Sequence, residues 1–297
     1  NRYGVIRDLF AMVKSGRLPT SVYLEFLEAY KDEDSYIVWM EILSGMQEIY
    51  GITAGNKKLK QGLAKYYRNI LKIVAKKVGW VIDHKESQTR SLLRGAVLYA
   101  YGKYGDKQTV AQAEKVFSQR KKKPIHPDIR AAVYSLTGSN SNAKTQKELQ
   151  SMFEKETLQE EQRRIGRGLV SIKNPALFQK TLSYILSKHV RPQDAPMMIA
   201  VALMINDHKL AVWKWVQKNW TTLHNRYGDD HLIVWIIKGL SGFNDIKQAE
   251  EIIQFFKKHP TPTAQRAIKQ VVEQIKLQAA WLKRDQKDIT KTLKRIA

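Results

Sequence analysis

The chain has 297 residues, of which 43% are hydrophobic and 27% charged, a balance that fits a globular protein and excludes a disordered one. It contains no cysteine, which excludes disulfides, thiolate nucleophiles and cysteine-ligated zinc, and suits a reducing cytoplasm. The formal net charge of +23 favours acidic partners such as nucleic acid, an anionic membrane or an acidic sister domain, although a lysine-rich proteome would explain it equally well.

The spacing of apolar residues predicts helices along almost the whole chain, and no stretch alternates as a strand would. The first helix is expected over residues 2–14, the second starts near Pro19-Thr20, and the third follows the acidic cluster 32–34. After a break at 51–55, a long helix has a single apolar stripe of Leu59, Leu63, Tyr66, Ile70, Val74 and Val78. Further along, one packed helix face is predicted for Trp213, Val216, Trp220, Leu223 and Tyr227. The apolar face of the last helix runs from Ile268 to Ile296.

These segments amount to about fifteen helices, separated by short breaks rich in Gly, Pro, Asn or Asp. Short connections make consecutive helices antiparallel neighbours, and pairs with one apolar face each must stack to build a core. We therefore predict an all-α fold, an α-solenoid of antiparallel helix pairs, with a compact irregular bundle as the alternative. No linker divides the chain, so residues 1–297 are predicted to form a single helical-repeat domain. An apolar helix follows Asn1-Arg2 at once, which indicates a fragment of a larger chain.

The search for catalytic motifs is negative. A helical zinc peptidase needs H-E-x-x-H, but no two of the seven histidines are four residues apart and none is followed by Glu. Gly166-x-Gly168 lies inside a helical pattern, so we expect it to allow close helix packing rather than to bind phosphate. Asp229-Asp230-His231 is interpreted as a helix cap rather than a metal cluster. We predict no catalytic and no metal-binding residue in this chain.

A basic stripe of Lys65, Arg68, Lys72 and Lys76 lies on the long helix, away from its apolar side. Such a stripe is the electrostatic footprint of a protein that binds a phosphate backbone. Tyr66 lies on the apolar side, where we expect it in the core and not stacked on a base. We therefore interpret the stripe as a solvated basic face, with nucleic-acid binding as the alternative.

Several short patterns occur in order along nearly the whole chain: Asn1-Arg2-Tyr3 through Leu18, Asp34-Ser35-Tyr36 with Trp39, Leu93-Arg94, Asp128-x-Arg130 with Val133-Tyr134, Arg191-Pro192-Gln193-Asp194-Ala195, Trp213 to Val216 with Asn219-Trp220, and Trp281-Leu282 with Ile289. Together they resemble the C-terminal helical domain of zinc aminopeptidases of the aminopeptidase-N type, which include antigen-trimming aminopeptidases and tricorn-interacting factors. The family has a glycine-containing turn before its Trp helix, where this chain has residues 206–209 without glycine. Any substrate role of that turn is therefore in doubt.

The resemblance implies a bowl of HEAT- or armadillo-like helix pairs that caps the active-site cavity of a zinc metallo-aminopeptidase and contributes to peptide access and binding. The chain would be a non-catalytic part of that enzyme, without a cofactor of its own, and the zinc would lie in the parent's catalytic domain. Its expected partners are that catalytic domain and the peptide substrate; neither a membrane nor nucleic acid is expected, and the expected location is cytoplasmic. The alternative is a free-standing helical-repeat scaffold that binds nucleic acid or an acidic protein, and a membrane-surface module is a third option.

One predicted helix suggests residues that could bind peptide. At 100° per residue, Arg163 and Arg167 fall almost opposite an apolar face that includes Ile165 and Leu169, so both arginines point away from the core. Paired arginines suit the terminal carboxylate of a peptide, because their forked donors can bind it in a bidentate manner. Arg164 lies to the flank and is the weaker candidate. The alternative is that these are solvated surface arginines.

Overall fold

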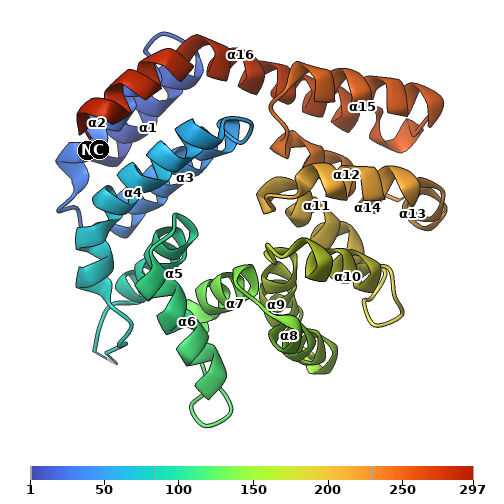
Figure 1. The fold of residues 1–297 in the computed structure, drawn as a ribbon, viewed down its shortest axis with the longest axis horizontal. Helices are drawn as coiled ribbons and strands as arrows, with labels where there is room; N and C mark the ends of the chain where they lie inside the picture. Colours follow the sequence, from blue (N-terminus) through green and yellow to red (C-terminus); the bar gives the residue numbers. More distant parts are fainter. Residues whose placement is uncertain (1, 84, 229, 297) are drawn as a thin grey trace. The chain divides into compact units, whose positions relative to one another are not determined.

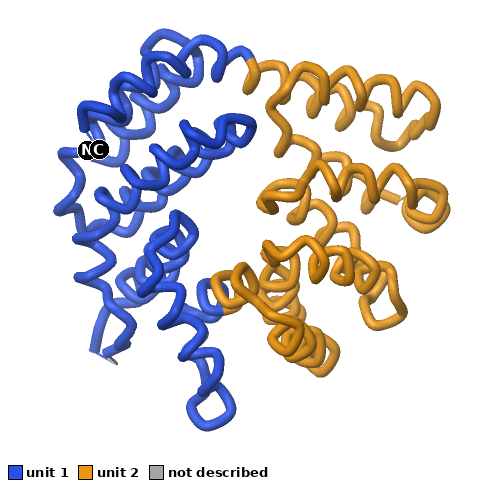
Figure 2. Tube along the Cα trace, viewed as in Figure 1, with its two compact units in different colours: residues 1–133, 280–297 blue, residues 134–279 orange. Residues whose placement is uncertain are grey.

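The computed structural model describes residues 2–83, 85–228 and 230–296 and, over these residues, contains 16 α-helices and no strand. The all-α prediction is therefore confirmed. The chain divides into two compact units, unit 1 comprising residues 1–133 with 280–297 and unit 2 comprising residues 134–279 (Figure 2). One bowl-shaped domain over the whole chain stays a prediction.

Unit 1 contains helices from both ends of the chain (Figure 1). Its helices are α1 (Arg2–Lys14), α2 (Thr20–Leu27), α3 (Tyr36–Ile52), α4 (Lys57–Val78), α5 (Gln88–Lys103), α6 (Lys107–Gln119), the first half of α7 (Pro127–Ser139) and the second half of α16 (Gln265–Ile296). The bounds of α1 and the start of α2 agree with the sequence prediction. The long predicted helix is α4, whose first turn is capped because the Asn56 side chain accepts a hydrogen bond from the backbone N–H of Leu59 at 3.0 Å.

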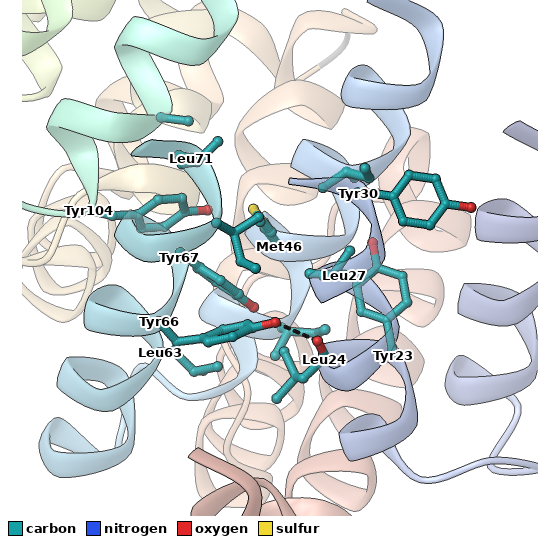
Figure 3. Close-up of a cluster of buried hydrophobic side chains, with 14 of the residues drawn as sticks. Tyr23, Leu24, Leu27, Tyr30, Met46, Leu63, Tyr66, Tyr67, Leu71 and Tyr104 are labelled. Atoms are coloured by element: carbon teal, nitrogen blue, oxygen red, sulfur yellow. Dashed lines mark hydrogen bonds between the residues drawn. The ribbon is translucent and has the colours of Figure 1, made fainter. Parts of the chain in front are cut away.

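Buried tyrosines fill the centre of unit 1 (Figure 3). Tyr66 is fully buried and its hydroxyl donates to the carbonyl oxygen of Leu24. The rings of Tyr67 and Tyr104 lie edge to face with centroids 5.0 Å apart, an arrangement that the quadrupoles of the rings favour. Burial raises the pKa of Tyr67 and that of Tyr23, so both phenols stay neutral. Tyr66 therefore belongs to the core, as predicted.

The second half of α16 completes unit 1 by capping α2. The Asp285 carboxylate accepts hydrogen bonds from the backbone N–H of Thr20 at 3.0 Å and from its hydroxyl at 2.5 Å, and Arg284 donates to the same carboxylate. The indole N–H of Trp281 donates to the Thr20 hydroxyl at 2.8 Å. Burial of Asp285 opposes ionisation, but the hydrogen bonds from Arg284 and Thr20 hold the pKa of this carboxyl below its ordinary value. The start of α2 thus receives a cap that the preceding Pro19 does not provide.

Unit 2 stacks its helices in two layers. The first layer contains the end of α7, α9, α11 and α14, which pack side by side, and the second contains α8, α10, the pair α12 and α13, and α15 (Figure 1). The first half of α16 also belongs to unit 2. The bounds are α8 (Ala143–Lys155), α9 (Gln159–Val170), α10 (Pro175–Ile185), α11 (Ala195–Ile205), α12 (Lys209–Lys218), α13 (Trp220–Tyr227), α14 (Leu232–Gly239) and α15 (Ile246–Lys258). Within unit 2, two layers of paired helices are what a helical solenoid requires.

Glycines let the helices of the first layer approach each other closely. A Cβ atom on Gly168 of α9 would lie 2.8 Å from the carbonyl oxygen of Tyr134 in α7, and one on Gly138 would collide with the backbone of Gly168. Neither clash can be relieved by rotating a side chain, since the obstructing atoms belong to the backbone. The role predicted for Gly168 in close helix packing is therefore confirmed. A Cβ atom on Gly166 would meet only side chains, the nearest being the ring of Phe153 at 3.3 Å.

The predicted Trp face is buried but belongs to two helices instead of one. Trp213 and Trp220 are both nearly inaccessible, and both rings pack against Phe255 of α15. The helix is interrupted at Asn219, which ends α12 and precedes α13, and whose side chain donates to the carbonyl oxygen of Trp215 at 2.8 Å. The backbone of Asn219 leaves the helical conformation at this point, with φ −102° and ψ 13°.

Candidate functional site

The three candidate arginines lie on α9 and differ in their exposure and in the ion pairs that they form. Ile165 and Leu169 are buried, Arg163 is exposed and Arg167 is half-buried, so the predicted division of the helix into two faces is correct. Arg164, on the flank, forms ion pairs with acidic residues of the same helix. Its distances are 2.5 Å to Glu160 and 2.9 Å to Glu161.

Glu161 explains why Arg164 is the weaker candidate for binding a ligand. Its side chain is almost completely buried and also accepts a hydrogen bond from the Tyr134 hydroxyl of α7 at 2.9 Å. A buried carboxylate needs such partners because an uncompensated charge is costly in the interior. Arg164 therefore helps to hold α9 against α7.

The residue patterns that carry the family resemblance are engaged in internal contacts. In the 191–195 turn, Arg191 pairs with Asp194 at 2.7 Å and donates to the side-chain oxygen of Gln162 in α9 at 2.5 Å. This turn thus connects the start of α11 to α9. None of these contacts points to a ligand.

A second pattern forms the turn before α3. The Glu33 carboxylate accepts from the backbone N–H groups of Asp34 at 3.0 Å and of Ser35 at 2.8 Å, while Arg2 pairs with it at 2.8 Å. The indole N–H of Trp39 donates to the carbonyl oxygen of Glu33 at 2.8 Å. The predicted match between this acidic cluster and a helix start is confirmed, and Glu33 holds the turn that leads into α3.

Among the described residues of unit 1, Arg94 has the most deeply buried charged side chain, with 1% of it exposed. It donates to the carbonyl oxygen of Val78 at 3.0 Å and forms a bidentate pair with Glu86, thereby connecting α5 to the loop after α4. The hydrogen bond from Arg94 lowers the pKa of Glu86. The family's Leu-Arg pattern therefore serves the fold.

The turn at 206–209, where the family has glycine, is built around a buried asparagine. The Asn206 side chain donates to the carbonyl oxygens of Val170 at 2.7 Å and Ile172 at 3.0 Å, at the end of α9. It also accepts from the backbone N–H of His208 at 2.7 Å. Where the family has a glycine, the hydrogen bonds of the Asn206 side chain hold the turn in one conformation. This role was not predicted from the sequence.

The basic stripe of α4 is largely solvated. Lys65, Lys72 and Lys76 are exposed, while Arg68 donates to the carbonyl oxygen of Tyr104, the residue that directly follows α5. One of the four cations thus stabilises a helix terminus.

The proposed cap after Gly228 is present in part. The Asp230 carboxylate accepts from the backbone N–H of Leu232 at 3.1 Å and lies 2.6 Å from the His231 ring; Asp229 lies outside the described residues. Over residues 2–83, 85–228 and 230–296, no three His, Asp or Glu side chains gather as metal ligands would. Among these same residues, no helix combines the length and apolar character that crossing a membrane requires.

The sequence analysis missed an apolar stripe on α11. This helix contains the apolar run Met197–Ile205, and the structure places Met204 of this run at the surface with 53% exposure. Trp235 of the neighbouring α14 is also 42% exposed. The sequence of α11 contains no polar residue, so the spacing of its apolar residues cannot show which side of the helix is exposed to solvent.

Comparison with known proteins identifies the family. The model of the ERAP1-like C-terminal domain matches residues 1–277. Aminopeptidase M1 of Arabidopsis thaliana is 28% identical over 97% of this chain and 34% of its own length, and glutamyl aminopeptidase of Sus scrofa is 28% identical over 97% of this chain and 31% of its own. Aminopeptidase 2 of Candida albicans is 25% identical over 97% of this chain and 32% of its own length. The chain spans about a third of the length of these relatives. It belongs to the family of ERAP1-like C-terminal domains, the helical C-terminal part of aminopeptidases.

Proposed function

We propose that this chain is the non-catalytic C-terminal domain of a zinc metallo-aminopeptidase, where it caps the active-site cavity and contributes to peptide access and binding. The observation that carries the proposal is the family match over residues 1–277 combined with relatives, named as aminopeptidases, that are matched over only about a third of their length. The sequence has no H-E-x-x-H motif, so zinc and catalysis would belong to the parent's catalytic domain, its main partner. We infer a cytoplasmic location for the parent.

A capping role requires a rigid wall more than a reactive site. A domain that closes over an active site excludes water and commits the bound substrate. The helix pairs of this chain suit that role, because buried charged groups such as Arg94 and Glu161 are paired internally and lock neighbouring helices together.

We further propose that Arg163 and Arg167 of α9 bind a peptide carboxylate. Arg163 is exposed, and Arg167 lies one helical turn further along the same side. Guanidinium groups four residues apart can hold both oxygens of a carboxylate. Arg164 contributes less, since it is already engaged by Glu160 and Glu161.

The test uses the full-length parent carrying Arg163→Ala and Arg167→Ala together. For a long peptide, KM is expected to rise about tenfold or more, the worth of one or two hydrogen bonds to a charged group. The KM of a small aminoacyl anilide, which cannot reach α9, should stay unchanged. Lys180→Ala, an exposed cation of the second layer, is the matched control. Equal effects on the peptide and on the anilide would contradict the carboxylate site.

The basic stripe of α4 provides a separate test of the alternative function. If it is a solvated face, duplex DNA should bind only in the non-specific range, with Kd of about 10⁻⁴ to 10⁻⁶ M at physiological salt. Nanomolar binding that depends on sequence, and that is lost on replacing Lys72 and Lys76, would favour a nucleic-acid scaffold over the capping domain.

A further inference from the structure

Two loops lie at the same end of unit 1. Near the start of α5, the Ser91 hydroxyl donates to the Asp128 carboxylate near the start of α7 at 2.6 Å, so these two helix starts lie close together. The loop that follows α4 leads into α5, and the loop that follows α6 leads into α7 (Figure 1). Both loops therefore lie at this end, and together with the last turns of α4 and α6 they form the basic end of unit 1, residues 72–83, 85–90 and 115–126.

Most charged side chains of the basic end are cations. Residues 115–123 contain five cations and no acid, namely Lys115, Arg120, Lys121, Lys122 and Lys123. The end of α4 and the loop after it add five exposed cations, namely Lys72, Lys76, Lys77, Lys85 and Arg90. The acids of this second segment are Asp83 and Glu86, and Glu86 is paired with buried Arg94. The Lys77 ammonium also lies 3.4 Å from the Asp32 carboxylate. The cations outnumber the acids, and a surface of one sign attracts anionic partners.

An apolar side chain projects among these cations. Val81, in the loop after α4, is 85% exposed, more than any other large hydrophobic side chain among the described residues. Its neighbours Trp80 and Ile82 are half-buried. The loop is anchored from behind, because the Arg94 guanidinium donates to the carbonyl oxygens of Val78 at 3.0 Å and Gly79 at 3.2 Å. A tryptophan beside exposed aliphatic residues and lysines is the composition of segments that enter the interface of a membrane.

A hollow beside this loop brings cations and apolar groups together. It has a volume of about 470 Å³, and its lining includes Lys77, Trp80, Val81, Lys85 and Arg90. The Arg90 guanidinium donates to the backbone carbonyl oxygen of Lys77 at 2.8 Å, which holds the start of α5 against the end of α4. Ammonium and guanidinium groups bind phosphate oxygens through charge-assisted hydrogen bonds. The hollow therefore suits the phosphate of a lipid headgroup whose acyl chains lie next to Val81.

We propose that the basic end of unit 1 is a docking surface for an anionic membrane. Val81 enters the headgroup region, and the surrounding lysines pair with lipid phosphates. Each Lys or Arg near an anionic leaflet strengthens binding about fivefold. This peripheral contact goes beyond the capping function and differs from the expectation of no membrane partner, because apolar periodicity does not reveal a single exposed loop residue.

Nucleic acid would attract the same cations, and the side chains around them favour a membrane. Proteins that bind single strands present aromatic rings on which bases stack. On α4, however, Tyr66 and Tyr67 are fully buried in the core. The most exposed apolar group is the aliphatic Val81, which has no ring to stack on a base and loses unfavourable contact with water when it enters lipid. An anionic membrane complements both the charge and the apolar group.

The experiment measures sedimentation of the full-length parent with vesicles. One set contains phosphatidylcholine alone, and the other is an equal mixture of phosphatidylcholine and phosphatidylserine. The variants are V81S, which removes the apolar side chain, and K121Q/K122Q/K123Q, which removes three charges. Their controls in unit 2 are L158S, which removes an exposed apolar side chain from another loop, and K180Q/K214Q/K218Q, which removes three charges from exposed lysines. Thermal unfolding and cleavage of an aminoacyl anilide check that each variant is folded and active.

We expect the parent to bind the mixed vesicles at least about tenfold more tightly than the neutral ones. V81S should weaken this binding about fivefold, and K121Q/K122Q/K123Q about a hundredfold, while both controls stay within about twofold. Anilide cleavage should be unchanged in every variant, so failure of this inference leaves the capping function untouched. Equal binding to both kinds of vesicle, or equal losses in the variants and their controls, would overturn the inference. Tighter binding to single-stranded DNA than to the mixed vesicles, unaffected by V81S, would identify nucleic acid as the partner instead.

Discussion

Unit 1 and unit 2 differ in the contacts that hold their helices together. Unit 1 uses buried tyrosine rings and a carboxylate, Asp285, that connects the last helix to α2. Unit 2 brings helix backbones into direct contact through Gly138 and Gly168, and its first layer leaves Met204 and Trp235 exposed. The family's residue patterns lie in the internal contacts of both units, so the resemblance in sequence reports the fold, and the exposed face is where a ligand has to be sought.

The largest effect is expected when the link between the chain ends of unit 1 is removed. Asp285→Ala removes the cap of α2 and leaves the backbone N–H and the hydroxyl of buried Thr20 without their acceptor, which should cost about 3–4 kcal/mol of unfolding free energy. Urea unfolding gives the free energy, and hydrogen exchange should locate the loss in α1 and α2. Lys287→Ala, exposed on the same helix, is the control and should stay within about 0.5 kcal/mol. Increased exchange confined to unit 2 would contradict this assignment.

The corresponding change in unit 2 is Gly138→Ala. The new methyl group would collide with the backbone of Gly168 and push α7 from α9, at a cost of about 2–3 kcal/mol. Gly4→Ala in α1 is the matched control, because nothing lies within 4 Å of the added carbon. There the substitution should stabilise the helix by about 0.5–1 kcal/mol. If both variants lose stability equally, close backbone contact is not what requires glycine at 138.

A smaller difference in unfolding free energy is expected between two arginine variants of α9. Arg164 and Tyr134 are the two partners of the buried Glu161 carboxylate described above, and Arg164→Ala removes the first of them. This change should lower the unfolding free energy of unit 2 by about 1–2 kcal/mol. Arg163→Ala, which removes an exposed side chain, should change the unfolding free energy by less than about 0.5 kcal/mol. Chemical denaturation of both variants compares them directly, and equal losses would place Arg163 in the fold instead of in a binding surface.

The smallest effect is the pH dependence of unit 1. The folded-state pKa values of Asp285 and Glu86 lie below their ordinary values of 3.8 and 4.5. These carboxylates therefore contribute stability that is fully present above their ordinary pKa values and is lost as pH falls through the folded values. Stability should change little from pH 7 to about pH 5 and decline below about pH 4. For Asp285→Asn the deficit relative to the unmodified chain should shrink in that acidic range, and a constant deficit would show that ionisation of Asp285 is irrelevant.

Periodicity predicted the helices well, because a helix with one apolar and one polar side has a clear pattern. The bounds of α1, the start of α2 and the burial of Tyr66 all followed from it. The predicted Trp helix is interrupted at Asn219, whose non-helical backbone conformation apolar spacing does not record. The cap of α2 could not be predicted either, since Asp285 lies 265 residues from Thr20 in sequence.

The candidate site was predictable only in part. The outward direction of Arg163 follows from its position on the helix, but the partner of Arg164 depends on the burial of Glu161 against α7, which is a tertiary contact. The apolar stripe on α11 could not be predicted for a different reason. α11 is apolar on every side, so only its neighbours decide that Met204 is the side left exposed.

The contact between Asp285 and Thr20 also has a consequence for the order of folding. All of unit 2 is encoded before residue 280, whereas unit 1 is complete only when the second half of α16 has been made. Domains generally fold as units during synthesis, and contacts between residues distant in sequence form late. The middle of the chain can therefore reach its native structure while α1 and α2 still lack their last partner. For that interval the apolar surface that α16 will cover is exposed, which makes the beginning of this chain the part most in need of a chaperone during translation.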